Sequence, residues 1–375
     1  MQEDAIRLGV IGTGLAVERL HWPALERLTD AFRVTAFANH SRPKAEHFAD
    51  YAGMSMDDYA ADYHVLLERS DVDAVLISLP IPMNYPVTKA ALEAGKHVIC
   101  EKPAGVNDVE ARKFIELVDQ YPDLTVLITE NSFYQDAARL ARSQIDGGAL
   151  GRIHLASWRT VSQLVPKEGQ FSSTPWRHHP GYEGGPHLDA GVHHTAIIRL
   201  LCGDVEQVSG VSQDANTTHG GPSDLSLNLR FVSGAVGNYT ASYPELAVPR
   251  EPNDFRIYGT EGVMSFRYRE FSVHPPDEPA TTYRTGQFDG GHYNAFLNFA
   301  EAIRFGEPVI GTVAQTYRNM QIVLDGLQAA AVGEVRAIDP FPSELSATAL
   351  PLWSPKRTDP LFDNPDYVTI ERVKA

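Results

Sequence analysis

Short apolar runs separated by helix-like segments characterise the first third of the chain. The runs are rich in Val, Ile and Leu and lack polar alternation, which indicates strands buried on both faces, as in a parallel sheet. They are Ile6–Ile11, Val34–Ala38, Val72–Leu79, His97–Cys100 and Thr125–Ile128. Asn107 and Glu110 resemble a capping box at the start of one intervening helix. The alternation predicts a doubly wound α/β domain over residues 1–129.

Strict alternation of polar and apolar residues replaces this pattern later in the chain. From Asp224 to Phe231 every second residue is Leu or Phe and the others are polar, which predicts an antiparallel strand with one buried side. Further strands are expected at Arg152–Val161, Val205–Val211, Ala235–Tyr243 and Phe255–Phe266, with a hairpin turn at Ser233-Gly234. Late helices are expected at Tyr293–Phe305, ended by Gly306, and at Val313–Val332, capped by Thr312 and Gln315 and ended by Gly333. The pattern predicts an α+β domain over residues 130–340, and the proline-rich, aperiodic residues 341–375 are expected to form an extended arm.

Composition narrows the class of protein. The net charge is −16 and no Lys/Arg run stands out, so a nucleic-acid partner is not expected. The two cysteines, Cys100 and Cys202, fall in different predicted domains, which favours free, buried thiols over a disulfide. No stretch approaches the ~20 apolar residues of a membrane-spanning helix, and the acidic start of the chain does not resemble a signal peptide. We expect a cytoplasmic protein without membrane contact.

A strand, a glycine turn and a helix follow one another at the start of the chain. Gly12 permits a tight turn, and Gly14 lets the backbone approach a pyrophosphate at the helix N-terminus. Such a glycine pair is often only structural, but its place at the first strand–helix junction favours dinucleotide binding. Val17 stands where a small residue is expected, which changes the packing of helix against strand. The predicted contacts here are Gly12, Thr13, Gly14, Leu15 and Ala16.

The choice of dinucleotide depends on the end of the second strand, where NAD-preferring sites usually have an acidic residue. Here no carboxylate is present, and Arg42 and Lys44 suit a 2′-phosphate, with Ser41 and Asn39 as hydrogen-bond donors. The alternative is a pair of solvated cations at a helix start. We predict NADP as the cofactor, with NAD as the alternative. The predicted contacts in this segment are Asn39, His40, Ser41, Arg42 and Lys44.

Two further motifs carry a family resemblance. Ala94-Gly95-Lys96-His97-Val98 leads into Cys100-Glu101-Lys102-Pro103, and Gly184-Gly185-Pro186-His187-Leu188-Asp189 leads to His193. Together with Gly12-Thr13-Gly14, and from about residue 6 to about 335, the chain resembles the glucose–fructose oxidoreductase/inositol dehydrogenase/rhizopine-catabolism (Gfo/Idh/MocA) family. The resemblance implies a Rossmann domain followed by an α+β domain with a large, mostly antiparallel open sheet. It also implies an NAD(P)-dependent oxidoreductase that acts on CH–OH groups of a sugar, cyclitol or related polyol.

The resemblance places three catalytic residues on this chain, namely Lys102, Asp189 and His193. Hydride transfer from a carbinol carbon requires removal of the hydroxyl proton, a role that suits histidine with its ordinary pKa of ~6.5. If Leu188–Leu201 is one helix, Asp189 and His193 face the same way, and Asp189 orients the imidazole or the substrate. Lys102 is expected to relay the proton and stabilise the alkoxide. The structural alternatives are an exposed lysine, a capping aspartate and a packed histidine.

Other expected contacts follow from the same resemblance. The segment Leu79-Pro80-Ile81-Pro82-Met83-Asn84 stands where the family often has Thr-Pro-Asn and a later His. Backbone contacts of Leu79, Pro80 and Asn84 to the nicotinamide half are expected to survive that change. The remaining cofactor contacts are Glu101, Lys102, Asn131, Trp176 and Arg177. The expected substrate-binding residues are Lys102, Tyr134, Arg159, Trp176, His187, Asp189, His193 and Tyr293.

Five histidines gather in a short segment and raise the question of a metal site. They are His178, His179, His187, His193 and His194. Their spacing gives no familiar ligand set and the resemblance implies no metal, so we expect them to line a sugar-sized pocket.

Two other functions stay open from the sequence. One is a glycosidase that oxidises its substrate transiently with a bound dinucleotide, and the other is a non-catalytic, cofactor-binding regulator. Because a sheet with one uncovered face usually needs a partner, we expect a homodimer or homotetramer.

Overall fold

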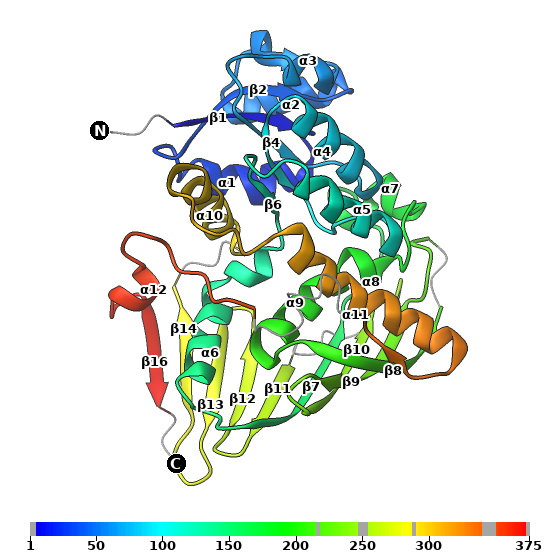
Figure 1. Cartoon of the computed structure of the whole chain (residues 1–375), viewed down its shortest axis with the longest axis vertical. Coiled ribbons are helices and arrows are strands. Elements are labelled where there is room, and N and C mark those ends of the chain that lie inside the picture. Colours follow the sequence, from blue (N-terminus) through cyan, green and yellow to red (C-terminus); the bar gives the residue numbers. More distant parts are fainter. Residues whose placement is uncertain (1–4, 215–217, 247–253, 287–289, 340–349, 373–375) are drawn as a thin grey trace. The chain divides into compact units, whose positions relative to one another are not determined.

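The computed structural model describes residues 5–214, 218–246, 254–286, 290–339 and 350–372. The chain forms two compact units (Figure 1). The first contains residues 1–131 and 289–317, and the second contains residues 132–288 and 318–375. The chain thus returns to the first unit late, a feature absent from the linear division expected from the sequence.

The first unit contains a six-stranded parallel sheet with strand order β3-β2-β1-β4-β5-β6. The strands are β1 (Ile6–Ile11), β2 (Phe32–Ala38), β3 (Tyr59–Ala60), β4 (Ala74–Ile77), β5 (His97–Cys100) and β6 (Val126–Ile128). The helices are α1 (Trp22–Leu25), α2 (Arg42–Ala52), α3 (Tyr63–Leu67), α4 (Asn84–Glu93), α5 (Asp108–Asp119) and α10 (His292–Phe305). The predicted Rossmann sheet is confirmed, and only the two-residue strand β3 was missed. Asn107 caps α5 as predicted, accepting a hydrogen bond of 2.9 Å from the amide of Glu110.

The returning segment covers one side of the first unit. The ring of Phe32, in β2, packs against Phe296 and Phe299 of α10 at centroid distances of 5.8 and 6.4 Å. The amide of Ile128, at the end of β6, donates to the carbonyl oxygen of Gly311. Helix α10 ends at Gly306, which has a left-handed backbone, as its sequence predicted.

The second unit contains a ten-stranded sheet with strand order β15-β8-β9-β10-β7-β11-β12-β13-β14-β16. All neighbouring pairs are antiparallel except β7 and β10. The strands are β7 (Ile153–Val161), β8 (Val205–Gln213), β9 (Asp224–Phe231), β10 (Val236–Ser242), β11 (Asp254–Gly259), β12 (Val263–Arg267), β13 (Glu270–His274), β14 (Thr281–Thr285), β15 (Arg336–Ala337) and β16 (Val368–Arg372). This confirms the large, mostly antiparallel sheet.

One predicted strand of the second unit is wrong in detail. Phe255–Phe266 is two strands, β11 and β12, because the chain turns back between Gly259 and Val263. The buried residues are Phe255 and Ile257 in β11 but Met264 and Phe266 in β12, so the alternation changes phase at the turn. Helix α11 (Val313–Val332) begins in the first unit and ends in the second. Its start is capped as predicted, since the hydroxyl of Thr312 accepts a hydrogen bond from the backbone amide of Gln315.

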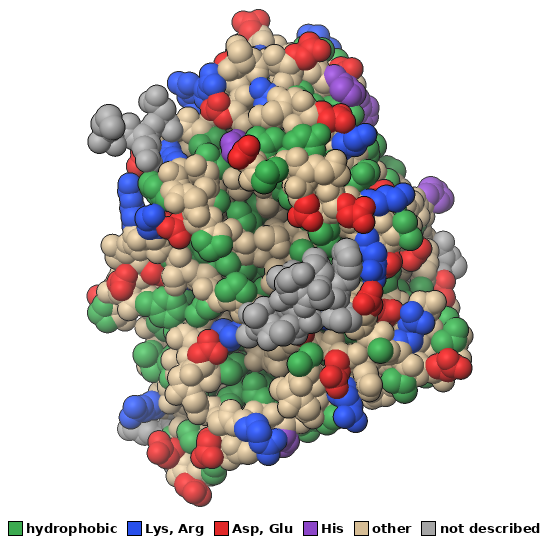
Figure 2. All heavy atoms as spheres, in the orientation of Figure 1, with side chains coloured by type: hydrophobic (Ala, Val, Ile, Leu, Met, Phe, Trp, Pro, Cys, Tyr) green, Lys and Arg blue, Asp and Glu red, His purple; other side chains and the backbone are tan. Residues whose placement is uncertain are grey.

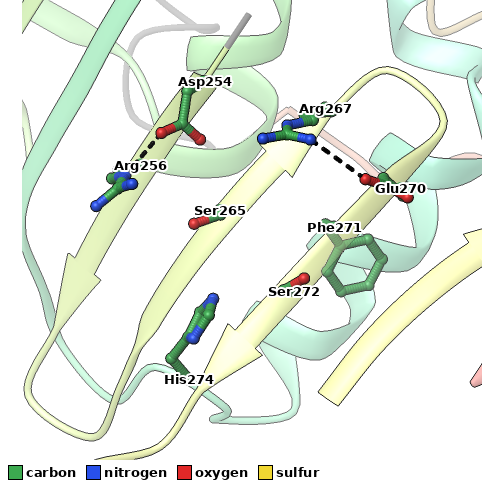
Figure 3. A pocket seen from close by; sticks show the side chains of 8 residues that line it. All are labelled: Asp254, Arg256, Ser265, Arg267, Glu270, Phe271, Ser272 and His274. Carbon is green, nitrogen blue, oxygen red and sulfur yellow. Dashed lines mark hydrogen bonds and ion pairs between the residues drawn. The ribbon is translucent and has the colours of Figure 1, made fainter. Parts of the chain in front are cut away.

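The two faces of the ten-stranded sheet differ in character. The inner face carries large buried rings such as Trp158, Phe255 and Phe271, and helices α6 (Asp136–Asp146) and α9 (Gly191–Cys202) pack on it (Figure 1). The outer face is polar, and on β11, β12 and β13 it forms a shallow pocket of about 230 Å³. Figure 3 shows this pocket with two ion pairs across it, Asp254 with Arg256 and Arg267 with Glu270.

The last described residues are anchored on the second unit by a buried arginine. Arg139, on α6, is 1 % exposed and donates to the carbonyl oxygen of Trp353 and to the carboxylates of Asp136 and Asp359. The chain then forms α12 (Pro360–Asp363) and β16, which pairs with β14. The expected extended arm therefore includes a sheet strand, while residues 340–349 lie outside the described residues. Cys100 and Cys202 are buried and free, as predicted.

The glycine turn after β1 contains one glycine that the fold requires. Gly12 has φ +89°, and a Cβ there would overlap the carbonyl oxygen of Ser78 and lie 2.8 Å from the Leu79 side chain. Gly14 differs, because no protein atom lies within 4 Å of the Cβ position. The chain itself therefore gives no steric reason for a glycine at position 14.

We expect Gly12→Ala and Gly14→Ala to affect stability very differently. Gly12→Ala combines a left-handed backbone with a backbone clash and should destabilise the protein by about 2 kcal/mol or more. Gly14→Ala should change stability by less than about 1 kcal/mol. Urea unfolding followed by circular dichroism measures both values, and equal losses in the two variants would contradict this account of the turn.

Candidate functional site

One edge of the parallel sheet collects most of the predicted cofactor residues. Because the strands are parallel, their carboxyl ends lie at the same edge, where ligands bind in open α/β sheets. The strand order reverses between β1 and β4, at the glycine turn. The residues at this edge are Gly12–Ala16 after β1, Asn39–Lys44 after β2, Leu79–Asn84 after β4, Glu101 and Lys102 after β5, and Asn131 after β6. Trp176 and Arg177 belong to the second unit.

The glycine turn offers backbone groups rather than side chains. The side chain of Thr13 is buried, and its hydroxyl accepts a hydrogen bond of 2.8 Å from the amide of Asn39. Gly14, Leu15 and Ala16 are half-buried, and the first N–H groups of a helix lack intrahelical partners. The helix then widens into a π-helical turn, η1 (Val17–His21), in which Val17 and His21 are buried. The bulky Val17 is accommodated by this wider turn.

The end of β2 combines a rigid loop with an exposed cationic helix start. The Oδ1 atom of Asn39 accepts from the amide of Ser41 at 2.9 Å, so both ends of its side chain are engaged within the chain. Ser41 is the N-cap residue of α2, but its hydroxyl makes no capping hydrogen bond. Arg42 is exposed and pairs with Glu46, and Lys44 is exposed on the first turn. Cations here oppose the helix dipole, which favours an anion instead.

The loop after β5 is held by a buried amide. Asn84 is completely buried, and its Nδ2 donates to the carbonyl oxygens of Glu101 and Pro103 at 2.8 and 3.2 Å. The side chain of Asn84 therefore fixes the Glu-Lys-Pro segment. Asn131 is similarly engaged, since its Nδ2 donates to the carbonyl oxygen of Gly290 at 2.5 Å.

Two histidines that the sequence analysis missed surround the carboxylate of Glu101. Nε2 of His21 lies 2.7 Å from Oε1 of Glu101, and the rings of His21 and His292 meet edge to face at 5.2 Å. Burial acts to raise the pKa of Glu101, but the His21 hydrogen bond and electrostatic interactions with His21, Lys102 and His292 lower it to about 2. A histidine among the apolar residues of the first helix is a signal that was available in the sequence.

In the second unit, Asp189 is held by Arg177. Nε of Arg177 donates to Oδ2 of Asp189 at 2.6 Å, and a second nitrogen reaches Oδ1 at 3.4 Å. The guanidinium also stacks on Trp176 at 4.1 Å and donates to the hydroxyl of Thr174. Tyr182, another residue missed from the sequence, packs on Trp176, and burial followed by the nearby Asp189 carboxylate raises its pKa. The structure thus groups these aromatic and charged side chains.

The expected continuous helix over Leu188–Leu201 is wrong. Asp189 ends the short helix α8 (Pro186–Asp189), and α9 starts at Gly191 after an interruption at Ala190. Gly191 lies at the interruption, and a Cβ there would come within 3.3 Å of the hydroxyl of Tyr239. His193, on the first turn of α9, is half-buried and its Nδ1 lies 3.4 Å from the hydroxyl of Ser132.

The remaining histidines of the cluster lie in separate environments. His194 is buried against Trp158, and its Nδ1 lies 2.7 Å from the hydroxyl of Tyr239. Burial lowers the pKa of His194 to about 3 and that of His187 to about 4. His187 is completely buried, with its ring against Tyr243. His178 approaches the carbonyl oxygen of Ser172, while His179 is exposed.

Three other predicted substrate residues contact different parts of the chain or face solvent. Tyr134 is completely buried with its ring against Trp353. Arg159 is exposed on β7, beside the buried Trp158, which faces α9, so Arg159 lies on the outer face of the sheet. Tyr293 lies in the first unit, where the guanidinium of Arg27 covers its ring at 4.3 Å.

Three further observations concern the charges on the surface, the helices and the metal-binding side chains. On the face drawn in Figure 2, acidic and basic side chains are interspersed rather than gathered by sign. Among the described residues, no helix combines the length and apolarity needed to cross a membrane. Within the same residues, His, Cys, Asp and Glu side chains form no group of three that is able to hold a metal ion.

Two family profiles match the chain. Residues 6–127 match an oxidoreductase family with an NAD-binding Rossmann fold, and residues 138–265 match the GFO/IDH/MocA C-terminal domain. The chain is 28 % identical over 327 residues to dTDP-3,4-didehydro-2,6-dideoxy-alpha-D-glucose 3-reductase of Streptomyces violaceoruber, covering 80 % of this chain and 86 % of that protein. It is 28 % identical over 233 residues to levoglucosan dehydrogenase of Pseudarthrobacter phenanthrenivorans, covering 56 % and 58 %.

Solved structures give the same result. An oxidoreductase from Thermotoga maritima is 32 % identical with a TM-score of 0.81, covering 91 % of this chain and 100 % of that one. A levoglucosan dehydrogenase in complex with NADH and levoglucosan has a TM-score of 0.79 at 22 % identity, covering 90 % and 100 %, and shares the fold. The chain therefore belongs to the GFO/IDH/MocA family of oxidoreductases, with an NAD-binding Rossmann domain and the C-terminal domain of that family.

Proposed function

We propose that this protein is an NADP-preferring dehydrogenase or reductase that acts on a secondary alcohol or ketone of a sugar, cyclitol or related polyol. The proposal is carried by one observation, the open glycine turn at Gly14 on the same sheet edge as Glu101 and Lys102. The relatives named above act on sugars, as their names state, which supports a hydroxyl-rich substrate.

The first unit fits a dinucleotide at the glycine turn. Apart from the adjoining backbone, a Cβ at position 14 would meet no atom of the chain within 4 Å, so its absence leaves room for a group outside the chain. The helix that follows offers backbone N–H groups and the positive end of its dipole, which suit a pyrophosphate. When bound, the nicotinamide would supply the hydride acceptor or donor.

The preference for NADP rests on the start of α2. The segment Asn39–Lys44 contains no carboxylate that would accept from a ribose 2′-hydroxyl, and Arg42 and Lys44 are exposed there. The hydroxyl of Ser41 makes no capping bond and is suited to donate to a phosphate. His40 is exposed beside it. These groups together favour a 2′-phosphate.

Lys102, Asp189 and His193 are the proposed catalytic residues. In the oxidative direction the bound dinucleotide would supply the hydride acceptor, and a base of the chain would take the O–H proton, which would leave a ketone. His193 suits the base, since Ser132 orients its ring. Arg177 holds the carboxylate of Asp189, which is suited to accept hydrogen bonds from substrate hydroxyls. Trp176 gives an apolar surface for a sugar ring. Lys102 would donate to the developing alkoxide.

The activity is tested by a spectrophotometric screen of sugars and cyclitols with NADP and NAD in parallel. We expect formation of NADPH with at least one polyol, and a loss of about 100-fold or more in kcat for Lys102→Met with dinucleotide affinity preserved. Lys89→Met, an exposed lysine of α4, is the control. Cleavage of a glycoside without net NADPH would favour the glycosidase. Binding without any turnover would favour the regulator.

The cofactor preference is tested by removing the cations of α2. For Arg42→Ala/Lys44→Ala, kcat/KM with NADP should fall by about 10- to 100-fold, because two charge-assisted hydrogen bonds are lost. Values with NAD should change little, and Lys89→Ala/Lys113→Ala, which removes two exposed lysines of α4 and α5, serves as the charge-matched control. An equal decrease with both dinucleotides would contradict a 2′-phosphate site at this helix.

We further propose a homodimer or homotetramer that buries the outer face of the ten-stranded sheet. Its pocket carries charges of both signs, which a twofold axis can pair with the same surface of a second copy (Figure 3). Ser272→Arg should shift the sedimentation coefficient towards the monomer, whereas Val65→Arg, at an exposed position of α3, should not. A native protein that sediments as a monomer at micromolar concentration would refute the proposal.

A further inference from the structure

A buried histidine joins two loops that strand pairing keeps apart. His21 follows the glycine turn after β1, and Glu101 follows β5. In the sheet, β4 lies between β1 and β5, so no backbone ladder connects these two segments. The contact of 2.7 Å between Nε2 of His21 and Oε1 of Glu101 connects them directly.

Both carboxylate oxygens of Glu101 have a hydrogen-bonding partner. Its Oε1 faces His21, and its Oε2 accepts from the backbone amide of Lys102 at 3.1 Å. These two contacts fit an ionised carboxylate that accepts on both oxygens, with the proton on Nε2 of His21. The pKa of Glu101, about 2 in spite of burial, agrees with this arrangement. One carboxylate therefore links the His21 ring to the main chain of Lys102.

His21 is the last residue of the π-helical turn η1. Residues 17 and 21 are four positions apart, so they fall on the same side of the helix. Val17 and His21 are the buried residues of η1, and the amide of Trp22 donates to the carbonyl oxygen of Val17. Such turns occur frequently at functional sites. Here it places an imidazole under the residue that precedes Lys102.

Packing alone does not require an imidazole at position 21. His21 is completely buried, and the other rings at its edge are His292 at 5.2 Å and Phe296 at 5.7 Å. A phenyl ring would make similar edge-to-face contacts with both. The hydrogen bond to Glu101 is the property that phenylalanine would lack.

We propose that His21 is a positioning residue for Lys102, acting through Glu101 to fix the main chain at the base of the lysine side chain. The inference rests on the proposed function, because that function gives Lys102 its role in the chemistry. This link would fix the position of Lys102, which acts on the substrate, relative to the glycine turn, which binds the dinucleotide, within the first unit.

The test compares His21→Phe, which keeps the ring, with His21→Gln, which keeps a donor. In the holoprotein, kcat should fall by about 10- to 100-fold for His21→Phe and by less than about threefold for His21→Gln. The Kd of NADPH should change by less than about threefold in both. Trp22→Phe is the control, because Trp22 lies on the same helix but packs on Phe48. It should retain full kcat.

Two readouts separate positioning from a general loss of structure. Without the His21 hydrogen bond, the pKa of Glu101 should rise, so kcat of His21→Phe should decline on the acid side at a higher pH than in the native protein. Glu101→Gln and His21→Phe should also be non-additive, the double variant being no slower than either single one. Equal losses of kcat in His21→Phe and Trp22→Phe, or additive effects with Glu101→Gln, would overturn the proposal.

A substrate-free measurement distinguishes this proposal from the proposed function. Hydrogen–deuterium exchange of peptides spanning residues 99–106 reports on the backbone amide of Lys102. In the native protein this amide donates a hydrogen bond to the carboxylate of Glu101. Exchange should be faster in His21→Phe and native-like in His21→Gln. Unchanged exchange in a folded His21→Phe refutes the role of His21, whereas faster exchange without turnover on any polyol refutes only the proposed function. If His21→Phe does not fold, faster exchange in Glu101→Gln than in Trp22→Phe supports the linkage, and equal exchange refutes it.

Discussion

The close approach of Gly12 to the carbonyl oxygen of Ser78 is the constraint on which the candidate site of the first unit depends. A left-handed glycine at this point lets β1 end against the loop that follows β4, and the chain then turns directly into a helix. The conformation of this turn sets the direction of the helix that follows it. Gly14 is left facing open space, and the π-helical turn that begins three residues later ends at His21, whose ring contacts Glu101. One missing methyl group thus sets the start of the helix and, through it, the surroundings of the Glu-Lys-Pro loop.

Sequence patterns predicted the elements that have strong local signals. Buried Val/Ile/Leu runs located five strands of the parallel sheet, and caps such as Asn107, Gly306 and Thr312 located helix ends within a residue or two. Most of the elements that were missed have weak signals. Strand β3 has two residues. The hairpin at Gly259–Val263 did have a signal, since the alternation of buried residues changes phase between Ile257 and Met264, but the prediction read the segment as one strand. Strand β16 is mostly exposed, so it carries little apolar periodicity.

For the candidate site, the sequence predicted where the motif residues lie in the fold better than it predicted what their side chains contact. The motif residues of the first unit do meet at one sheet edge, because parallel strands bring distant loops together. Whether a polar side chain then faces a ligand or the chain depends on contacts between distant segments. Asn39 and Asn84 turned out to be engaged by Thr13 and by the Glu101–Pro103 backbone, and Tyr134 and His187 are completely buried. His21 was missed for the same reason, since its partner lies eighty positions away.

The late return of residues 289–317 to the first unit bears on how the protein is made. During synthesis the six-stranded sheet emerges from the ribosome long before α10, whose Phe296 and Phe299 cover Phe32 and whose His292 packs on His21. One apolar side of the sheet therefore stays exposed until most of the chain has been translated. Dividing the gene after residue 131 would therefore yield a fragment that contains the glycine turn and the lysine but lacks the helix that completes their unit.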